Sequence, residues 1–384
     1  MRKLPNYQGP VRSDRTPPTY DEATNRRQKA RAAGLDPNYW YPVEYDDAIA
    51  PGQVREVVFW GKSYALFRDT KGALHVVENR CAHRQLKLTA GVVDGCNLVC
   101  SYHGWRYDGS GRVVSMDHEL FGRSMPKLAI EHRAVSVRYG LVWVFFGDPA
   151  RSTERDVPRI PELEGSDAWP CVPIDFVWKA HHSMIIDNVS DFTHAFLHRK
   201  YQPFTDAKLT DCRTEGDAVH VSYDAKIATG PVYRWIVDRR GMNTNRMDLC
   251  YEYPFQWSNT DGKIKHHLFV LPVDRTTTRV FFLFYYDRHA FKIPGVNVAM
   301  PKRLMLPLLH VGNSLLVKPL LEQDGSAVEE EQRGYDRHFD APAMELNPAI
   351  AAFQNLTVRK WEEHLASESD GRRRLAREPA NQIS

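Results

Sequence analysis

Two short motifs, Cys81-Ala82-His83 and Cys100-Ser101-Tyr102-His103, decide how the rest of this sequence is interpreted. Sixteen residues lie between them, and each motif combines one cysteine with one histidine. Thiolates and imidazoles are both strong ligands for transition metals. The two motifs therefore predict a domain in which two loops close on one metal centre.

The mixture of ligands in each loop separates two kinds of centre. A [2Fe–2S] cluster of the Rieske type takes two cysteines on one iron and two histidines on the other. A structural zinc site can also be Cys₂His₂, but its loops usually pair like ligands, as in C-x₂₋₄-C. Because each loop here pairs one cysteine with one histidine, the pattern favours a Rieske cluster, with zinc as the alternative.

The sequence around these motifs predicts a small all-β domain. Runs rich in β-branched and aromatic residues alternate with glycine-containing turns, and Asp108-Gly109-Ser110-Gly111 is typical of a hairpin turn. The expected strands are residues 54–60, 63–68, 74–78 and 139–146. Both cysteine–histidine loops then lie at strand ends, where a rigid scaffold can hold them.

A second histidine pair occurs in Asp191-Phe192-Thr193-His194-Ala195-Phe196-Leu197-His198. We expect a helix over residues 183–198, which would place Asp187, Asp191, His194 and His198 within an arc of roughly 60°. Two imidazoles and two carboxylates on one face are costly to bury unless they are paired or bound to metal. Taken alone, H-x₃-H is often only a helix face, and that alternative remains.

Two histidines and one carboxylate form the facial triad of non-haem Fe(II) oxygenases, so a carboxylate from elsewhere is needed. The segment Glu322-Gln323-Asp324-Gly325 is the best candidate, although it also resembles the start of a solvated charged helix. We predict Asp324 as the ligand, with Glu322 and Asp336 in reserve.

The remaining segments predict an α+β fold, in which an antiparallel sheet with covering helices, helix-grip-like, follows the β domain. Strands are expected at residues 220–227, 247–257, 264–273 and 278–286, and Asn347-Pro348 begins a helix reaching about residue 366. The expected divisions are a basic N-terminal arm (1–38), the cluster domain (39–150), a linker (151–170), the catalytic domain (171–366) and a C-terminal tail (367–384). The arm has eight Lys/Arg against four Asp/Glu, which is typical of a flexible or surface-laid segment.

Composition excludes several classes of protein. The 384 residues are 42% hydrophobic and carry a net charge of only +3, so the chain is globular and no global field indicates nucleic acid. The longest apolar region, residues 304–321, is interrupted by Pro307, His310, Asn313 and Lys318, so no transmembrane segment is expected. Six sparse cysteines without framework spacing indicate a reducing cytoplasm.

Over residues 38–366, these motifs together resemble the terminal oxygenase (alpha) subunit of Rieske non-haem iron oxygenases. The resemblance implies that Cys81, His83, Cys100 and His103 hold the cluster, and that His194, His198 and Asp324 hold Fe(II). Asp191, in the N-x-x-D-x-x-H-x₃-H string from Asn188, matches the family's bridging carboxylate. Ala82 and Ser101 stand where the family commonly has proline, which affects loop geometry and not ligation.

The resemblance also implies partners and a reaction. The H-x₃-H spacing is similar to the homotrimeric branch of carbazole dioxygenase, ketosteroid hydroxylase and O-demethylase relatives. There an electron crosses a subunit boundary, in this numbering through His103 and Asp191 to His194. NAD(P)H would supply electrons through a reductase or ferredoxin, and O₂ would hydroxylate, cis-dihydroxylate or oxidatively demethylate the substrate.

The substrate is expected to be an apolar aromatic or polycyclic molecule, because the probable pocket wall, residues 247–284, is aromatic and aliphatic. An ordinary sheet core has the same composition, so that alternative stays open. Arg234, Arg239, Arg240 and Arg246 are candidates for binding an anionic group, although surface positions account for them better. A desaturase or other non-oxygenative family member, and a zinc-stabilised binding protein, are the competing functions.

Overall fold

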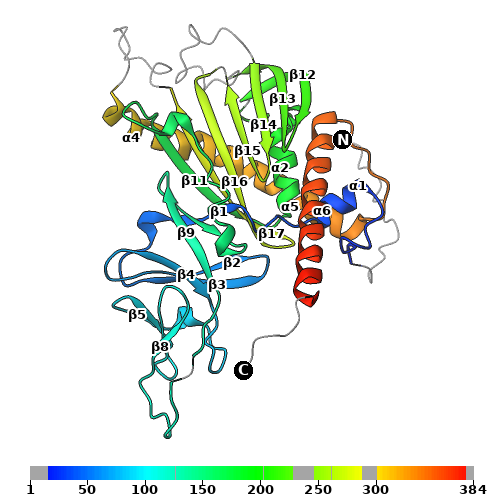
Figure 1. Ribbon diagram of the computed structural model, residues 1–384. Helices are drawn as coiled ribbons and strands as arrows, with labels where there is room; N and C mark the ends of the chain where they lie inside the picture. Colours follow the sequence, from blue (N-terminus) through cyan, green and yellow to red (C-terminus); the bar gives the residue numbers. More distant parts are fainter. Residues whose placement is uncertain are drawn as a thin grey trace, which may run out of the picture. The chain divides into compact units, whose positions relative to one another are not determined.

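The computed structural model describes residues 16–377 except 126, 202, 228–245, 261 and 288–300, with side chains described up to residue 369. The chain divides into two compact units. The first comprises Met1–Gly34, Trp178–Gly262 and Pro307–Ser384, and the second comprises Leu35–Val177 and Lys263–Leu306. Figure 1 labels their helices and strands.

The second unit is built from antiparallel strands. One six-stranded sheet has the order β1-β10-β9-β4-β3-β2, a four-stranded sheet has the order β5-β6-β7-β8, and a further group runs β11-β17-β16. The strands are β1 Trp40–Tyr45, β2 Val54–Phe59, β3 Lys62–Arg68, β4 Leu74–Glu78, β5 Val92–Asp94, β6 Asn97–Val99, β7 Arg106–Tyr107, β8 Val113–Ser115, β9 His132–Arg138, β10 Leu141–Phe145, β11 Cys171–Trp178, β16 Ile264–Asp274 and β17 Thr277–Tyr286.

Turn chemistry sets the register of this unit. The hairpin between β2 and β3 has a two-residue turn in which Trp60 and Gly61 both have positive φ, at 49° and 74°. This conformation matches the right-handed twist of the flanking strands. The predicted turn after Asp108 is also present, since the Asp108 carboxylate accepts hydrogen bonds from the backbone N–H groups of Ser110 and Arg112. The predicted strands around the two cysteine–histidine loops are therefore confirmed.

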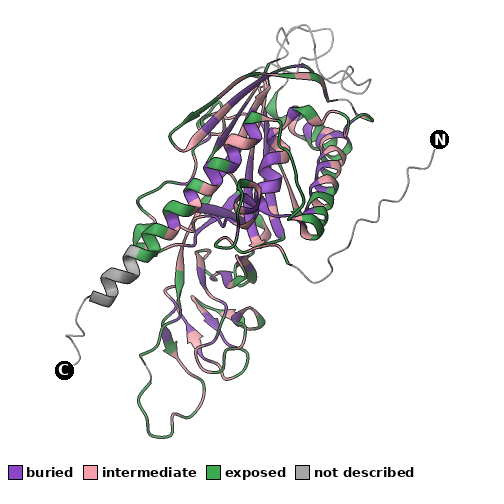
Figure 2. Ribbon diagram, turned by 90° about the vertical axis from the view of Figure 1, so that its right-hand side faces the viewer, coloured by how far each residue is buried: buried purple, intermediate pink, exposed green. Residues whose placement is uncertain are grey.

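The first unit combines four antiparallel strands with helices. The strand order is β15-β14-β13-β12. Its elements are α1 Arg26–Ala32, α2 His182–Ser190, the 3₁₀ turn η5 Phe192–His194, β12 Phe204–Glu215, β13 Ala218–Ile227, β14 Arg246–Glu252, β15 Phe255–Thr260, the π-helical turn η8 Asn313–Val317, α5 Lys318–His338 and α6 Pro348–Arg377; α4 Lys302–Gly312 spans the boundary between the units. On α6, buried residues such as Ile350 and Phe353 alternate with exposed ones, which Figure 2 shows as mixed colours along the helix.

The N-terminal segment differs from the expected flexible arm. Helix α1 buries Ala30 and Arg31, and the Arg31 guanidinium lies 2.7 Å from Asp187 Oδ2 and 2.9 Å from Glu331 Oε1. The positive charge that suggested a solvated arm is thus compensated inside the unit. The prediction is wrong for residues 26–35, and residues 1–15 lie outside the described part of the chain.

Two further predicted elements are wrong in extent. The expected helix over 183–198 ends at Ser190, because Asp191 is extended (φ −104°, ψ 99°) and its carboxylate accepts from the Thr193 N–H. Short polar side chains of this kind compete with helix hydrogen bonds. The expected strand at 247–257 is instead the β14–β15 hairpin, with Tyr253-Pro254 between the strands.

The C-terminal helix begins as predicted, since Asn347 Oδ1 accepts from the Ala349 N–H, but it continues to Arg377, past the expected end. The interruptions noted in residues 304–321 do not stop a helix either. Pro307 lies inside α4, and η8 follows directly. By length and composition alone, the run Lys302–His338 is able to cross a membrane, although part of that run is buried in the protein.

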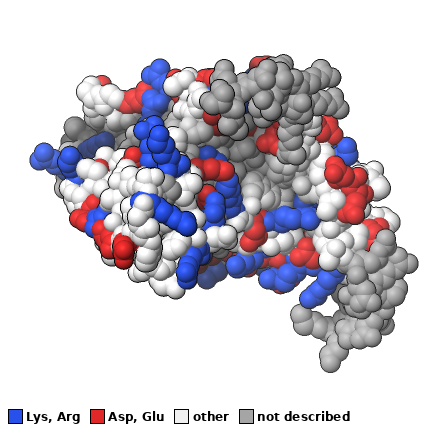
Figure 3. Space-filling model, turned by 60° about the horizontal axis from the view of Figure 1, so that its bottom comes forward, with Lys and Arg blue, Asp and Glu red and all other residues white. Residues whose placement is uncertain are grey.

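Figure 3 shows lysine and arginine side chains interleaved with aspartate and glutamate on the face it presents, in agreement with the small net charge of +3. Of the four arginines considered for anion binding, Arg246 lies in β14 and its Nε bonds Asp248 at 2.8 Å. Arg234, Arg239 and Arg240 lie outside the described residues.

Candidate metal centres

The two cysteine–histidine loops are closed by backbone hydrogen bonds. In the first, Cys81 N donates to Leu86 O at 2.8 Å, and in the second, Cys100 N donates to Trp105 O at 2.9 Å. Gly104 has φ +68°, a conformation that favours glycine, and an added Cβ would lie 2.8 Å from Asp117 Cβ. The sequence His103-Gly104 is therefore needed to turn the second loop back on itself.

This arrangement brings the predicted cluster ligands together in two pairs, the two cysteines and the two histidines. Both thiols are buried, with Cys81 and Cys100 each 2% exposed, and the rings of His83 and His103 have centroids 4.6 Å apart. Trp105 stacks on His83 with an interplanar angle of 6°. Within the described residues, the buried Nδ1 of His83 has no hydrogen-bond partner. Two adjacent buried thiols and an unsatisfied imidazole nitrogen suit a metal cluster and are otherwise costly.

Burial and hydrogen-bond donors act in opposite directions on the cysteine sulfurs. Burial, followed by the nearby Cys81, raises the pKa of the Cys100 thiol, whereas backbone N–H groups of Tyr102 and His103 donate toward its sulfur. Tyr107 Oη accepts from the Ala82 N–H at 2.9 Å and lies 3.2 Å from Cys81 Sγ. A cysteine sulfur bound to a cluster has no proton, so the tyrosine hydroxyl would donate to it, as in proteins that tune a cluster by hydrogen bonds.

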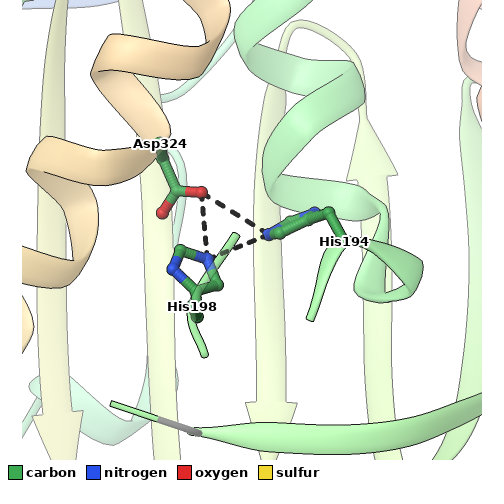
Figure 4. Close-up of side chains that lie close together, drawn as sticks. All are labelled: His194, His198 and Asp324. Carbon is green, nitrogen blue, oxygen red and sulfur yellow. Dashed lines mark hydrogen bonds and ion pairs between the residues drawn. The ribbon is translucent and has the colours of Figure 1, made fainter. Parts of the chain in front are cut away.

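The second site joins three side chains from two segments far apart in sequence. His194 ends η5, His198 follows in the next turns, and Asp324 lies in the second turn of α5. Figure 4 shows all three pointing at one another. The Nε2 atoms of His194 and His198 are 3.1 Å apart, and Asp324 Oδ1 lies 3.5 Å and 3.2 Å from them. The two histidines do not lie on a helix face, as was predicted. The residues that follow α2 bring them together instead.

The donor set of this site fits a divalent metal ion. Possible ligand atoms of the three residues lie within 4.8 Å of one another. His198 is 1% exposed and Asp324 is 5% exposed, and Asp324 Oδ1 accepts no hydrogen bond from the part of the chain that is described. Two imidazoles and one carboxylate leave open coordination positions on iron for O₂ and substrate.

Neighbouring residues orient these ligands. His198 Nδ1 is 3.0 Å from Gln323 Oε1, so Nδ1–H donates to the amide oxygen and the lone pair of Nε2 faces Asp324. Gly325 follows Asp324 inside α5, where glycine costs helix stability. A Cβ at Gly325 would lie 2.4 Å from Trp178 Nε1, so glycine permits the close approach of this helix.

The chain matches two known families, one over each set of ligands. Residues 39–120 match the Rieske [2Fe-2S] domain, and residues 178–368 match the vanillate O-demethylase oxygenase C-terminal domain. A 4beta-methylsterol monooxygenase of Methylococcus capsulatus is 44% identical over 357 residues, which is 92% of this chain and 96% of that protein. The chain is a Rieske non-haem iron oxygenase.

More distant relatives agree with this assignment. The iron-sulfur subunit TsaM1 of a toluene-4-sulfonate monooxygenase system from Comamonas testosteroni is 34% identical over 164 residues, or 42% of this chain and 46% of that protein. The crystal structure of dicamba monooxygenase bound to dicamba superposes with a TM-score of 0.70 at 17% identity, covering 87% of this chain and all of that one. The predicted fold class, a β Rieske domain followed by an α+β domain, is therefore confirmed.

As a Rieske oxygenase, the protein is an O₂-dependent oxidoreductase with a [2Fe–2S] cluster and a non-haem iron. Electrons come from a separate protein, as is typical of the family. The zinc-stabilised binding protein considered from the sequence is set aside, because the match to the Rieske domain spans both cysteine–histidine loops.

The pKa values of the two histidines in the oxygenase site diverge. Burial lowers the pKa of His194, and the charge of Asp324 opposes this only in part. For His198, burial also lowers the pKa, but the Asp324 carboxylate, 3.2 Å from Nε2, and the contact with Gln323 outweigh it, and the pKa is raised. Asp324 therefore interacts most strongly with His198.

The other carboxylates predicted for this site have different partners. Asp187 is bound by Arg31 and by Gln354 Nε2 at 2.8 Å, so it serves the packing of α2. Asp336 accepts from Gln332 at 2.8 Å. Glu322 lines an open surface hollow with Leu197 and Tyr201. Of the three candidates for the carboxylate ligand, the structure brings only Asp324 to the histidines among the described residues.

Asp191 lies beside the site, at the end of α2. Its Oδ1 accepts from the N–H and the hydroxyl of Thr193, at 2.8 Å and 2.7 Å, and from Asn347 Nδ2 at 3.0 Å. Sequence reasoning treated Asn347 only as a helix cap and gave Gln323 and Gly325 no role. The position of Gln323 and Gly325 on either side of Asp324 was the available signal for those two residues.

Proposed function

We propose that this oxygenase hydroxylates a methyl group on a sterol-like polycyclic substrate. The observation that carries the proposal is 44% identity to a 4beta-methylsterol monooxygenase over nearly the full length of both chains. That identity spans the regions of both candidate metal centres. A methylated ring system also agrees with the apolar polycyclic substrate expected from the sequence.

We assign the ligands as the sequence resemblance implied. Cys81, His83, Cys100 and His103 bind the cluster, and His194, His198 and Asp324 bind the iron. The burial of both thiols and the unsatisfied His83 Nδ1 and Asp324 Oδ1 support these assignments. Each of these atoms has a lone pair without a hydrogen-bond partner in the described residues, and a metal ion would accept it.

When bound, the two iron centres supply electrons and activate O₂. The overall reaction consumes R–CH₃, O₂, two electrons and two protons, and yields R–CH₂OH and water. Gln323 keeps the proton of His198 on Nδ1, so Nε2 remains available as a ligand. Asp324 contributes one negative charge, which offsets part of the charge of a divalent ion in this buried site.

The homotrimer belongs to the same proposal, with Asp191 as the bridging carboxylate. Three large apolar side chains near Asp191 are highly exposed. Phe196, at 79%, follows Asp191 in sequence, and Met344 and Leu346, at 84% and 81%, precede Asn347, which bonds Asp191. Large exposed apolar side chains next to polar groups are typical of an interaction surface. We assign this surface to the cluster domain of a neighbouring subunit, which would deliver the electron.

Oxidative demethylation of a methyl ether is the second candidate. The match of residues 178–368 to the vanillate O-demethylase oxygenase C-terminal domain favours it. Hydroxylation of an O-methyl group gives an unstable hemiacetal, so the same chemistry ends in loss of formaldehyde.

We place the enzyme in the cytoplasm, because all six cysteines lie in the described residues and each thiol is free.

The test is turnover with a reductase and NADH under ¹⁸O₂, offering a 4-methylated sterol and an aryl methyl ether in parallel. The proposal predicts a hydroxymethyl sterol that gains one ¹⁸O, detected by mass spectrometry. Asp324→Asn serves as the inactive control. Conversion of the aryl ether with no oxygenated sterol would replace the first candidate by the second.

A further inference from the structure

One face of the helical run that begins with α4 is apolar and open to solvent. Its exposed fractions are 60% for Leu304, 58% for Leu308, 57% for Val311 and 66% for Leu315. Their spacing of four, three and four residues places them along one side of the helix. We call these four residues the apolar stripe; α4 is labelled in Figure 1.

The opposite side of the same run is packed into the protein. Met305 is 1% exposed, Leu309 6%, Asn313 3% and Leu316 9%. The helix is therefore anchored by one apolar side and presents a second one outward. A segment with one side buried in protein is suited to lie along a bilayer, and not to cross it with lipid on every side.

The charged side chains of this helical run have a single sign. Between residues 302 and 321 the charged side chains are Lys302, Arg303 and Lys318, and the sequence has no aspartate or glutamate there. All three cationic residues are exposed. Leucine and valine flanked by lysine and arginine are the composition of helices that lie at the boundary between headgroups and acyl chains.

We infer that the apolar stripe docks the enzyme on the surface of an anionic membrane. The inference rests on the proposed function, because a sterol substrate is dissolved in the bilayer and not in water. A protein partner is less well matched, since interface anchors are enriched in tryptophan and tyrosine, and the stripe is purely aliphatic. The positive charge of this helical run also complements anionic headgroups directly.

The experiment is flotation of the full-length holoenzyme with sterol-free vesicles of phosphatidylcholine and phosphatidylglycerol at 7:3, compared with phosphatidylcholine alone. The double variant Leu308→Asp/Leu315→Asp removes the apolar character of the stripe. Val137→Asp is the matched control, because Val137 is 47% exposed but lies in β9. The visible spectrum of the cluster verifies that each protein is intact.

We expect wild type and Val137→Asp to float with the anionic vesicles and the double variant to lose about tenfold or more in partitioning. Each cationic residue should contribute about fivefold on anionic relative to neutral vesicles. Two results would overturn the inference: wild type that stays with the soluble fraction, or a double variant that floats as well as wild type.

Light scattering, which measures molar mass in solution, distinguishes membrane docking from contact with a second copy of the chain. If the double substitution reduces the molar mass of the assembly in solution, the stripe contacts a second copy of the chain and the membrane assignment is wrong. Failure of this inference is distinguishable from failure of the proposed function. An enzyme that oxygenates detergent-dispersed sterol but does not float contradicts only the docking, and an enzyme that floats but leaves sterol unchanged contradicts only the substrate.

Discussion

Asn347 Nδ2 donates to Asp191 Oδ1 at 3.0 Å and lies 2.9 Å from Tyr223 Oη, so the residue that caps α6 also holds the carboxylate at the end of α2. Three donors therefore converge on Oδ1 of Asp191. With that oxygen saturated, Oδ2 is the atom left to accept from a histidine. Asn347 is thus placed to orient the proposed bridge between the two metal centres.

Asn347→Asp should slow electron delivery to the iron. The substitution preserves an N-cap acceptor for Ala349 but replaces the donor to Asp191 by a negative charge. We expect reoxidation of the reduced cluster, followed by stopped-flow absorbance in a single turnover, to slow by about 10- to 100-fold with both metals retained. Asn347→Ser, which keeps a cap without adding charge, should show a smaller loss. Reoxidation of Asn347→Asp at the wild-type rate would remove this role.

Asp324→Asn should lose the mononuclear iron and keep the cluster. The amide supplies no negative charge to the site, so iron should fall from about three to about two per two sulfides, and turnover should fall at least about 100-fold. Iron and sulfide analysis with the EPR spectrum of the reduced cluster measures both. Glu322→Gln and Asp336→Asn are matched controls, and an iron loss in either one would show that the ligand had been misassigned.

Tyr107→Phe should make the cluster harder to reduce. The hydroxyl accepts from the Ala82 N–H and lies 3.2 Å from Cys81 Sγ. A cluster-bound sulfur has no proton, so the hydroxyl would donate to it and stabilise the more negative reduced state. Loss of one hydrogen bond corresponds to a potential lower by about 20 to 60 mV, measurable by EPR-monitored titration. Tyr102→Phe removes an exposed tyrosine hydroxyl from the same domain and should leave the potential unchanged. Equal potentials for Tyr107→Phe and wild type would contradict the assigned direction of this bond.

His182 should make the first unit acid-sensitive. Burial, with a smaller effect of Arg31, lowers its pKa to about 4, and Nε2 donates to Ala33 O at 3.0 Å. In the unfolded chain the histidine has a pKa near 6.5, so below that pH it binds a proton that it does not bind in the folded chain. Its contribution to the free energy of unfolding is therefore present above pH 6.5 and is lost as pH falls toward 4. At pH 5 the loss is about 2 kcal/mol.

The matched variant is His182→Gln, which retains a donor for Ala33 and does not titrate. Urea midpoints at pH 7 and pH 5 measure the effect, and the decrease between them should be smaller in His182→Gln than in wild type. An identical decrease in the two proteins would assign the acid sensitivity to other groups. His266 and His267, whose pKa values burial also lowers, to about 4 and 3, are expected to supply the remainder.

The sequence by itself determined the domain that contains the two cysteine–histidine loops. The ligand types occur within 23 residues of one another, and the turn residues Gly61 and Asp108 mark the strand ends beside them. Metal preference is a property of donor atoms, and hairpin turns depend on backbone conformations that few residues adopt. Local chemistry was therefore sufficient for the fold and the cofactor of this part.

Only the tertiary structure decided which residues surround His194 and His198. Asp324 is more than 120 residues away in sequence, and nothing local separates it from Glu322 or Asp336. The expected helix face is absent because the Asp191 carboxylate accepts from the Thr193 N–H where α2 ends. Asp187 pairs instead with Arg31, which lies in a segment expected to be flexible. Which distant side chain pairs with a buried charge depends on how the whole chain packs, and the local sequence does not specify it.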